Sequence, residues 1–162
     1  MADEDIRIVE LQPMRVAVFH AESTTPELDA WKKLSEWAKT KRFRAPSKKH
    51  RLFGFNNPDP SGDKPEYGYE AWVALAGAII DTPGPEPVFK NFPGGRYAVL
   101  RVKGIPNVRS EWKRLVRWRK KSDYNHGRHQ WLEEHLTNPD LPLDEIVLDL
   151  YLPIAKKRAK KA

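Results

Sequence analysis

The sequence predicts one α+β domain in which the same β-α-β-β unit occurs twice, forming one antiparallel sheet of about eight strands with two helices on one face. Three separate segments of the 162 residues match segments 81 positions further along, without a gap. They are a strand-like run, an amphipathic helix and an Asn-Pro-Asp turn. We place the two copies at about residues 6–77 and 87–154, so that residues 1–155 form one domain.

The matched residues are more specific than a shared amphipathic pattern. Arg15, Ala17 and Val18 correspond to Arg96, Ala98 and Val99; Trp31, Lys32, Leu34, Trp37 and Lys39 correspond to Trp112, Lys113, Leu115, Trp118 and Lys120; Asn57, Pro58 and Asp59 correspond to Asn138, Pro139 and Asp140. Tryptophan is rare, yet it matches twice, and the turn returns in register. We therefore interpret the pattern as an internal duplication.

The first copy is predicted to run strand, helix, strand, strand. Residues 15–19 are β-branched and aromatic, as in a strand. Thr25-Pro26-Glu27 offers a hydroxyl cap, a proline at the first helical position and an acid near the positive helix end. Apolar residues then continue at helical spacing to Ala38. Strands over 51–55 and 67–75 follow, separated by the proline-rich turn at 57–62.

The second copy repeats this order. A Pro-Gly-Gly turn at 93–95 leads into a strand over 96–102 and a helix over about 107–121. Strands are predicted near 131–136 and over 145–154. The segment 81–93, rich in Pro and Gly, joins the copies and adds a strand at 87–90.

The charge and composition restrict the function classes. The formal charge is +7, but the last seven residues, KKRAKKA, carry five positive charges and leave about +2 for the rest. We expect residues 156–162 to be a solvated, disordered tail, and nucleic acid to be a partner only through it. Cysteine is absent, which excludes disulfides and thiol chemistry. Without a long apolar run or a signal-peptide pattern, we expect a cytoplasmic protein with no membrane partner.

Five motifs resemble the GyrI-like small-molecule-binding domains, which belong to the AraC-type effector-binding and SOUL-like superfamily. They are Pro93-Gly94-Gly95-Arg96-Tyr97-Ala98-Val99, the helix tryptophans Trp112 and Trp118, Leu132-Glu133-Glu134-His135-Leu136-Thr137-Asn138-Pro139, Leu150-Tyr151-Leu152-Pro153-Ile154 and Tyr67-Gly68-Tyr69-Glu70-Ala71-Trp72. The resemblance implies a cleft between the copies that takes up hydrophobic, often cationic organic compounds, as in multidrug binding. It also implies relatives that are sensor halves of regulators, free-standing proteins or hydrolases of cyclopropane-bearing compounds.

The residue that matches the family's glutamate is Glu133. Strand alternation sends Trp131, Glu133 and His135 to one face. Counting back 81 positions gives Leu52, so the acid occurs in only one copy. A buried carboxylate among aromatic faces would attract a cation; the plain alternative is a surface acid on a solvated edge. The predicted ligand-binding residues are Glu133, His135, Tyr69, Trp72, Trp112, Trp131 and Tyr151.

His135 departs from the family pattern, which usually has an aromatic residue two positions after the glutamate. A histidine beside a carboxylate tends to be protonated, which would weaken the preference for cations. It could equally form an acid–base pair with Glu133. The cluster of His126, His129, Glu133 and His135 matches no metal-site spacing, so we expect no metal and no cofactor.

Three functional classes follow. The first, which we favour, is a stand-alone binding protein that holds a hydrophobic, cationic or neutral organic ligand with Glu133 as its polar anchor. The second is a hydrolase of electrophilic cyclopropane-bearing compounds, with Glu133 as the general base. The third is a protein-interaction module of the gyrase-inhibitor type, with a protein as its partner.

Overall fold

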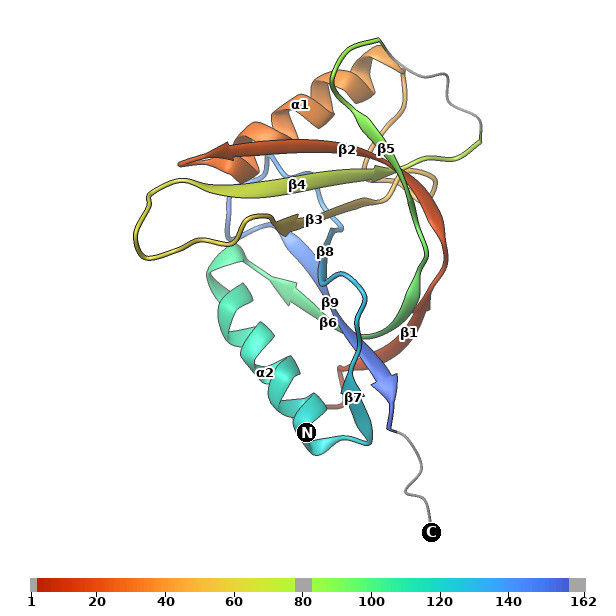
Figure 1. Cartoon of the computed structure of the whole chain (residues 1–162), viewed down its shortest axis with the longest axis vertical. Coiled ribbons are helices and arrows are strands. Elements are labelled where there is room, and N and C mark those ends of the chain that lie inside the picture. Colours follow the sequence, from red (N-terminus) through yellow and green to blue (C-terminus); the bar gives the residue numbers. More distant parts are fainter. Residues whose placement is uncertain (1–2, 78–82, 158–162) are drawn as a thin grey trace.

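The computed structural model describes residues 3–77 and 83–157 and confirms the α+β class. Its elements are β1 (Arg7–Leu11), β2 (Met14–Ser23), α1 (Pro26–Thr40), β3 (Leu52–Asn56), β4 (Tyr67–Ala74), β5 (Val88–Phe92), β6 (Gly95–Lys103), the 3-10 turn η1 (Ile105–Asn107), α2 (Val108–Lys121), β7 (Tyr124–His126), β8 (Leu132–His135) and β9 (Val147–Lys156). The strands curl into one antiparallel sheet beside the two helices (Figure 1).

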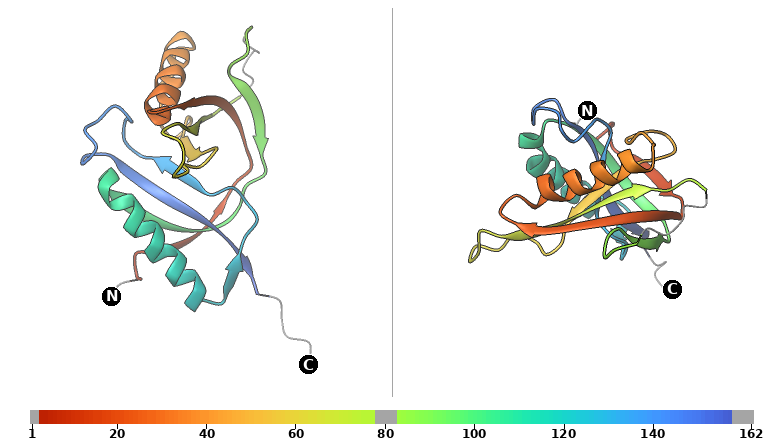
Figure 2. Two further views of the ribbon diagram at one scale, coloured as in Figure 1. Left: turned by 60° about the vertical axis from the view of Figure 1, so that its left-hand side comes forward. Right: turned by 90° about the horizontal axis from the view of Figure 1, so that it is seen from above.

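The strand order shows the duplication directly. Within the described residues the order is β1-β6-β9-β8-β3-β4-β2-β5, with β7 paired to β9 outside this path. The two copies therefore meet in the middle, where β8 pairs with β3, and we call this pairing the seam. Each copy also lends its leading strand to the other, because β1 pairs with β6 and β5 pairs with β2. Figure 2 shows the two halves related in this way, with one helix beside each.

The offset of 81 residues holds for the early part of each copy and then changes. β1 and β5 begin 81 residues apart, and so do β2 and β6. On the late strands, Gly54 pairs with Ala71 as Glu133 pairs with Leu150, which is an offset of 79. The structural counterpart of Glu133 is therefore Gly54, and the expected counterpart Leu52 is wrong by two residues.

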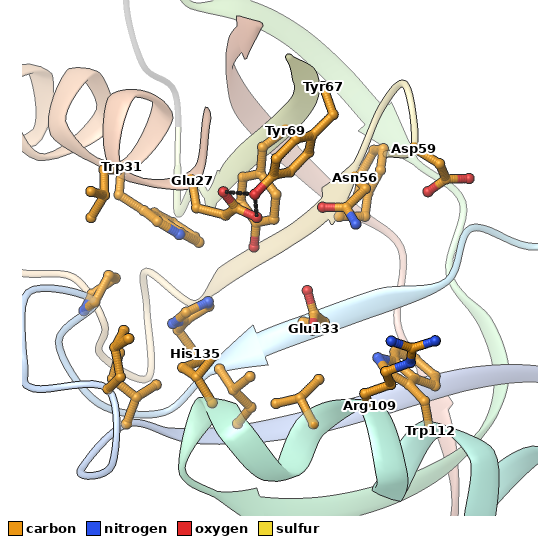
Figure 3. Close-up of a pocket in the computed structure, with 18 of the residues that line it drawn as sticks. Glu27, Trp31, Asn56, Asp59, Tyr67, Tyr69, Arg109, Trp112, Glu133 and His135 are labelled. Carbon is orange, nitrogen blue, oxygen red and sulfur yellow. Dashed lines mark hydrogen bonds between the residues drawn. The ribbon is translucent and has the colours of Figure 1, made fainter. Parts of the chain in front are cut away.

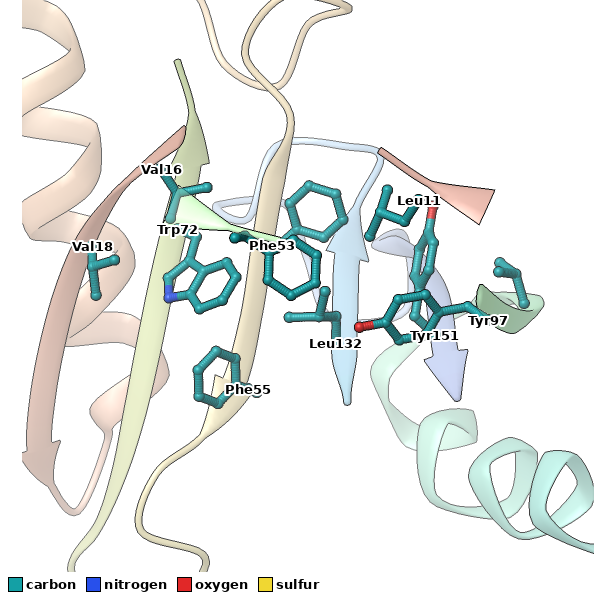
Figure 4. Close-up of a cluster of buried hydrophobic side chains, with 11 residues drawn as sticks. Leu11, Val16, Val18, Phe53, Phe55, Trp72, Tyr97, Leu132 and Tyr151 are labelled. Atoms are coloured by element: carbon teal, nitrogen blue, oxygen red, sulfur yellow. The ribbon is translucent and has the colours of Figure 1, made fainter. Parts of the chain in front are cut away.

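The sheet has two differently filled faces. The helix face carries two apolar clusters, one under α1 around Trp31 and Leu34 and one under α2 around Leu115 and Leu150. The opposite face holds a third cluster that includes Phe53, Trp72 and Tyr151 (Figure 4). Both helices thus lie on one face, as their apolar stripes predict.

Some local details differ from the expectations. α1 begins at Pro26, but the Thr25 hydroxyl makes no capping bond; instead the Thr25 N–H donates to Oγ of Ser23 at 3.1 Å. Ser23 in turn donates to Asp29 in the first turn of the helix. Strands β1 and β7 are additional to the predicted ones.

The basic tail begins later than expected. Lys156 is still part of β9, where it pairs with Tyr124, and Lys157 donates to the carbonyl of Ser122. Residues 158–162, the rest of the predicted tail, lie outside the described residues. Neither helix in the described part of the chain is long and apolar enough to cross a membrane.

Candidate functional site

A pocket of about 1240 Å³ opens on the helix face of the sheet, between α1 and α2. Its floor comes from β3, β4 and β8, and its walls come from the first turns of both helices. Both copies contribute to it, so the pocket lies where they meet. In Figure 3, Glu133 points from β8 into this space, between the side chains of α1 and those of α2.

Glu133 occupies the middle of the pocket floor. The seam fixes its position, because it pairs with Gly54 on one side and with Leu150 on the other. The side chain is half-buried. Burial raises the pKa of Glu133 to about 7, and repulsion from Glu27 acts in the same direction. A hydrogen bond from Trp112 lowers the pKa but does not offset these effects. Near neutral pH the group is therefore poised between its acid and its carboxylate.

The neighbouring acid, Glu134, shows what a structurally satisfied carboxylate looks like here. It points to the opposite face, where the Arg51 guanidinium donates two bonds of 2.8 Å to its two oxygens. The Tyr151 hydroxyl adds a third bond of 2.6 Å. Among residues 3–77 and 83–157, by contrast, no ion pair reaches Glu133. Glu133 is thus a carboxyl group that forms no direct ion pair with the described residues.

Buried rings form the wall below α1. Tyr69 is 2% exposed, and its ring centroid lies 5.9 Å from that of Trp31. Burial, and then the charge of Glu133, raise the pKa of the Tyr69 hydroxyl well above its ordinary value. On the other side of Trp31 the imidazole of His135 packs edge-on at 4.7 Å.

Apolar side chains also contribute to the α2 wall and to the mouth. Trp112 and Trp131 lie with ring centroids 5.3 Å apart. Around the opening, Leu28 is 65% exposed, Leu143 59% and Trp131 37%. Large apolar side chains left this open, next to a cavity, are typical of a surface that a hydrophobic molecule covers.

The structure adds polar residues that the sequence reasoning missed. Glu27 faces the pocket from the first turn of α1, where the Tyr67 hydroxyl donates to both of its oxygens at 2.8 and 2.7 Å. Burial and this carboxylate raise the pKa of Tyr67 to about 12. Arg109 and Lys113 line the pocket from α2. The helix start at Thr25-Pro26-Glu27 was visible in the sequence, but its place beside Glu133 depends on how the copies meet.

Five of the seven predicted site residues line this pocket, namely Tyr69, Trp112, Trp131, Glu133 and His135. Trp72 and Tyr151 do not, and this expectation requires correction: both belong to the apolar cluster on the opposite face. The reason is strand alternation, since Trp72 is an odd number of residues from Tyr69 and Tyr151 is adjacent to Leu150, the partner of Glu133. Figure 4 shows both rings among Phe53 and Leu132.

The surroundings of His135 bear on both readings of this residue. The side chain is 6% exposed, and burial lowers its pKa to about 3, so the imidazole is neutral at physiological pH. Its Nδ1 has no hydrogen-bond partner among the described residues, which means that it forms no acid–base pair with Glu133 through that atom. No group of three or more potential metal ligands occurs within residues 3–77 and 83–157.

Gly54 explains how the pocket accommodates Tyr69. A Cβ at this position would lie 2.0 Å from the Tyr69 hydroxyl oxygen. In the first copy, the absence of a side chain at Gly54 leaves room for the Tyr69 ring. The second copy has Glu133 at the equivalent position. The asymmetry expected from the sequence is present, with glycine in place of leucine as the counterpart.

The chain is thus a duplicated α+β domain with a pocket between its copies. The family model of the GyrI-like small molecule binding domain matches residues 4–155, and the chain belongs to this family. A search of curated protein sequences finds no match to the chain.

Solved structures share the fold at low sequence identity. The C-terminal domain of EcmrR superposes with a TM-score of 0.69 at 14% identity, covering 94% of this chain and 98% of that one. A hydrolase from Listeria innocua gives 0.62 at 10% identity, covering 93% and 92%. SAV2435, solved bound to tetraphenylphosphonium, gives 0.56 at 11% identity, covering 93% of each chain.

Proposed function

We propose that this protein binds a hydrophobic organic cation in the pocket between its copies, with the Glu133 carboxylate as the counter-charge. The observation that carries the proposal is the contrast on β8: Glu134 pairs with Arg51, whereas Glu133 faces an aromatic cavity and forms no ion pair with any described residue, although Arg109 and Lys113 also line that cavity. A half-buried carboxylate left in this way is costly, and a bound cation would offset that cost. Faces of Trp and Tyr add attraction for a delocalised positive charge.

Binding of tetraphenylphosphonium, the cation held by the neighbour SAV2435, tests the proposal. Titration calorimetry at pH 8 would compare it with neutral triphenylphosphine oxide. Glu133→Gln should weaken cation binding by about 1–3 kcal/mol, roughly 5- to 150-fold, because the lost interaction is a charged one in a dry site. The neutral compound should be affected far less.

Asp59→Asn provides the matched control. Asp59 lines the same pocket but is exposed, so its charge is screened. We expect this variant to bind the cation within about twofold of the parent at physiological salt. An unchanged cation affinity in Glu133→Gln, or an equal loss in both variants, would remove Glu133 as the anchor.

Hydrolysis is the second candidate, favoured by one observation. A carboxyl group with a pKa of about 7 is well matched to general-base catalysis at neutral pH. In this alternative, Glu133 removes a proton from water that attacks an electrophilic ring carbon, and the leaving carbon takes up a proton from solvent. Chromatography of a cyclopropane-bearing compound after incubation decides it: a hydrated product that Glu133→Gln fails to form supports catalysis, and recovery of the unchanged compound excludes it for that substrate.

A further inference from the structure

The second helix carries an unusual charge. Of its 14 residues, seven are basic and one is acidic, whereas α1 has three of each in 15 residues. The small net charge of about +2 outside the tail therefore conceals one strongly basic helix. This concentration distinguishes one copy of the duplication from the other, just as Glu133 does.

Five of the basic residues form a continuous exposed row along α2, and the first two of them also line the pocket. Four of them follow one another at four-residue spacing and the fifth lies three residues after the third, so that side chains along the row lie about one turn apart, about 5–6 Å between Cβ atoms. The row is about 18 Å long, from the helical rise of about 1.5 Å per residue. We call it the basic row: Arg109, Lys113, Arg117, Lys120 and Lys121.

The basic row lacks acidic partners. All five side chains are exposed, and none enters an ion pair or hydrogen bond with another described residue. Elsewhere arginines are paired, as Arg7 and Arg101 are with Asp149. Like charges one turn apart repel one another and destabilise an isolated helix. A polyanion that neutralises the row would remove this repulsion.

The surroundings of the row indicate which polyanion fits. The apolar face of α2, with Leu115 and Trp118, packs on the sheet, so no apolar face remains to enter a lipid bilayer. The described end of β9 adds charge at the C-terminal end of the helix, where Lys157 donates to Ser122. Figure 1 shows α2 on the outside of the molecule, uncovered by other elements.

We propose that the basic row binds the phosphate backbone of duplex DNA without sequence preference. Regularly spaced cations along an exposed helix match a rod of closely spaced phosphates, and most sequence-independent affinity of this kind comes from counterion release. B-form DNA has a major groove wide enough for a helix, which A-form RNA lacks. Unlike the expected role of the tail, this site belongs to the folded domain.

The test compares two double neutralisations in the full chain. Arg117→Gln/Lys121→Gln removes two charges of the row that lie outside the pocket. Lys32→Gln/Lys39→Gln removes two exposed charges from α1, the equivalent helix, and leaves the same net charge. Fluorescence anisotropy with a labelled mixed-sequence DNA duplex of about 20 base pairs, at about 50 to 200 mM salt, gives the affinity and its salt dependence.

The α2 variant should bind DNA at least tenfold more weakly, and the slope of log K against log salt should become shallower by about 2. The α1 variant should stay within about twofold of the parent, with the same slope. Equal effects in both variants, or no effect in the α2 variant because the tail carries the binding, would overturn the proposal. So would tighter binding of an RNA duplex, or binding of phosphatidylserine vesicles in preference to DNA.

Tetraphenylphosphonium binding separates this inference from the proposed function. Arg117 and Lys121 do not line the pocket, so the α2 variant should bind the cation like the parent while losing DNA. Its far-ultraviolet circular dichroism should also be unchanged. Loss of DNA binding together with loss of helix content would contradict a local electrostatic effect.

Discussion

At the residue scale, the proposed role of Glu133 predicts that ligand binding depends on pH. Its pKa of about 7 means that the charged form gains population as the pH rises through neutrality. A cation that cannot itself titrate should therefore bind more tightly at pH 8 than at pH 6, by up to about tenfold per pH unit below the pKa. Calorimetry of tetraphenylphosphonium over this range measures the effect, and in Glu133→Gln the affinity should be flat.

The same group predicts how stability depends on pH. The pKa of Glu133 is raised from 4.5 to about 7 on folding, so its contribution to stability is present below 4.5 and is lost as the pH rises to 7. Glu133→Gln has no titrating group at this position, so its unfolding free energy should not fall over this pH range. We expect the variant to gain about 1–3 kcal/mol in unfolding free energy over the parent at pH 8, and little at pH 4.5. Urea unfolding at the two pH values measures it, with Asp59→Asn as a control; an equal gain at both would contradict the assignment.

His135 has the opposite dependence. Burial lowers its pKa from 6.5 to about 3, so its contribution is present above 6.5 and is lost as the pH falls towards 3. His135→Phe keeps an aromatic ring beside Trp31 and removes both the titration and the unpartnered Nδ1. Between pH 7 and pH 4.5, the unfolding free energy of the variant should fall by about 2 kcal/mol less than that of the parent. His126→Gln, on an exposed ring, should behave like the parent; similar acid sensitivity in His135→Phe would be evidence against burial.

At the scale of elements, the packing of β4 against β3 requires that residue 54 has no side chain. A Cβ on Gly54 would meet the Tyr69 hydroxyl at 2.0 Å, and Tyr69 is too deeply buried to move freely. Gly54→Ala should cost about 1–3 kcal/mol of unfolding free energy and weaken ligand binding by displacing the ring. Gly62→Ala, in an exposed loop with no atom within 4 Å of the added Cβ, should be neutral. Thermal unfolding of the two variants compares them, and equal stability would refute the steric argument.

Most elements could be predicted from the sequence because their signals are local. Helix starts, apolar stripes and proline turns recur in both copies, so each prediction is supported twice. β7 escaped because three residues, Tyr124–His126, carry no periodic signal. β1 escaped because it is an edge strand with mostly exposed side chains.

The site was only partly predictable, for a geometric reason. Strand alternation over 131–135 predicts that Trp131, Glu133 and His135 share a face, and all three line the pocket, although β8 itself begins at Leu132. Between strands, the facing of a side chain depends on register, which no local pattern specifies. Trp72 and Tyr151 were therefore assigned to the wrong face, and the counterpart of Glu133 shifted from Leu52 to Gly54 when the offset changed to 79.

At the scale of the whole molecule, the seam between the two copies carries different polar groups on the two faces of the sheet. On the helix face it presents Glu133 to the pocket. On the opposite face it is locked by Arg51, just before β3, and Glu134 on β8, with Tyr151 of β9 bonded to both. β3 and β8 are paired over only three register positions, fewer than the five of β1 with β6 and of β5 with β2, so this polar lock reinforces the shortest of the three strand pairings between the copies.

Removing one partner of that lock should therefore destabilise the entire domain. Arg51→Met leaves the Glu134 carboxylate buried with only the Tyr151 hydroxyl, and we expect a loss of about 2–4 kcal/mol in a single cooperative transition. Arg51→Met/Glu134→Leu removes the stranded charge as well and should recover much of this loss. Arg96→Met, which breaks an exposed pair with Glu10 between β1 and β6, should cost less than about 1 kcal/mol. Urea unfolding free energies of the four proteins decide the point: if Arg51→Met costs no more than Arg96→Met, strand pairing and apolar packing connect the copies without help from the lock.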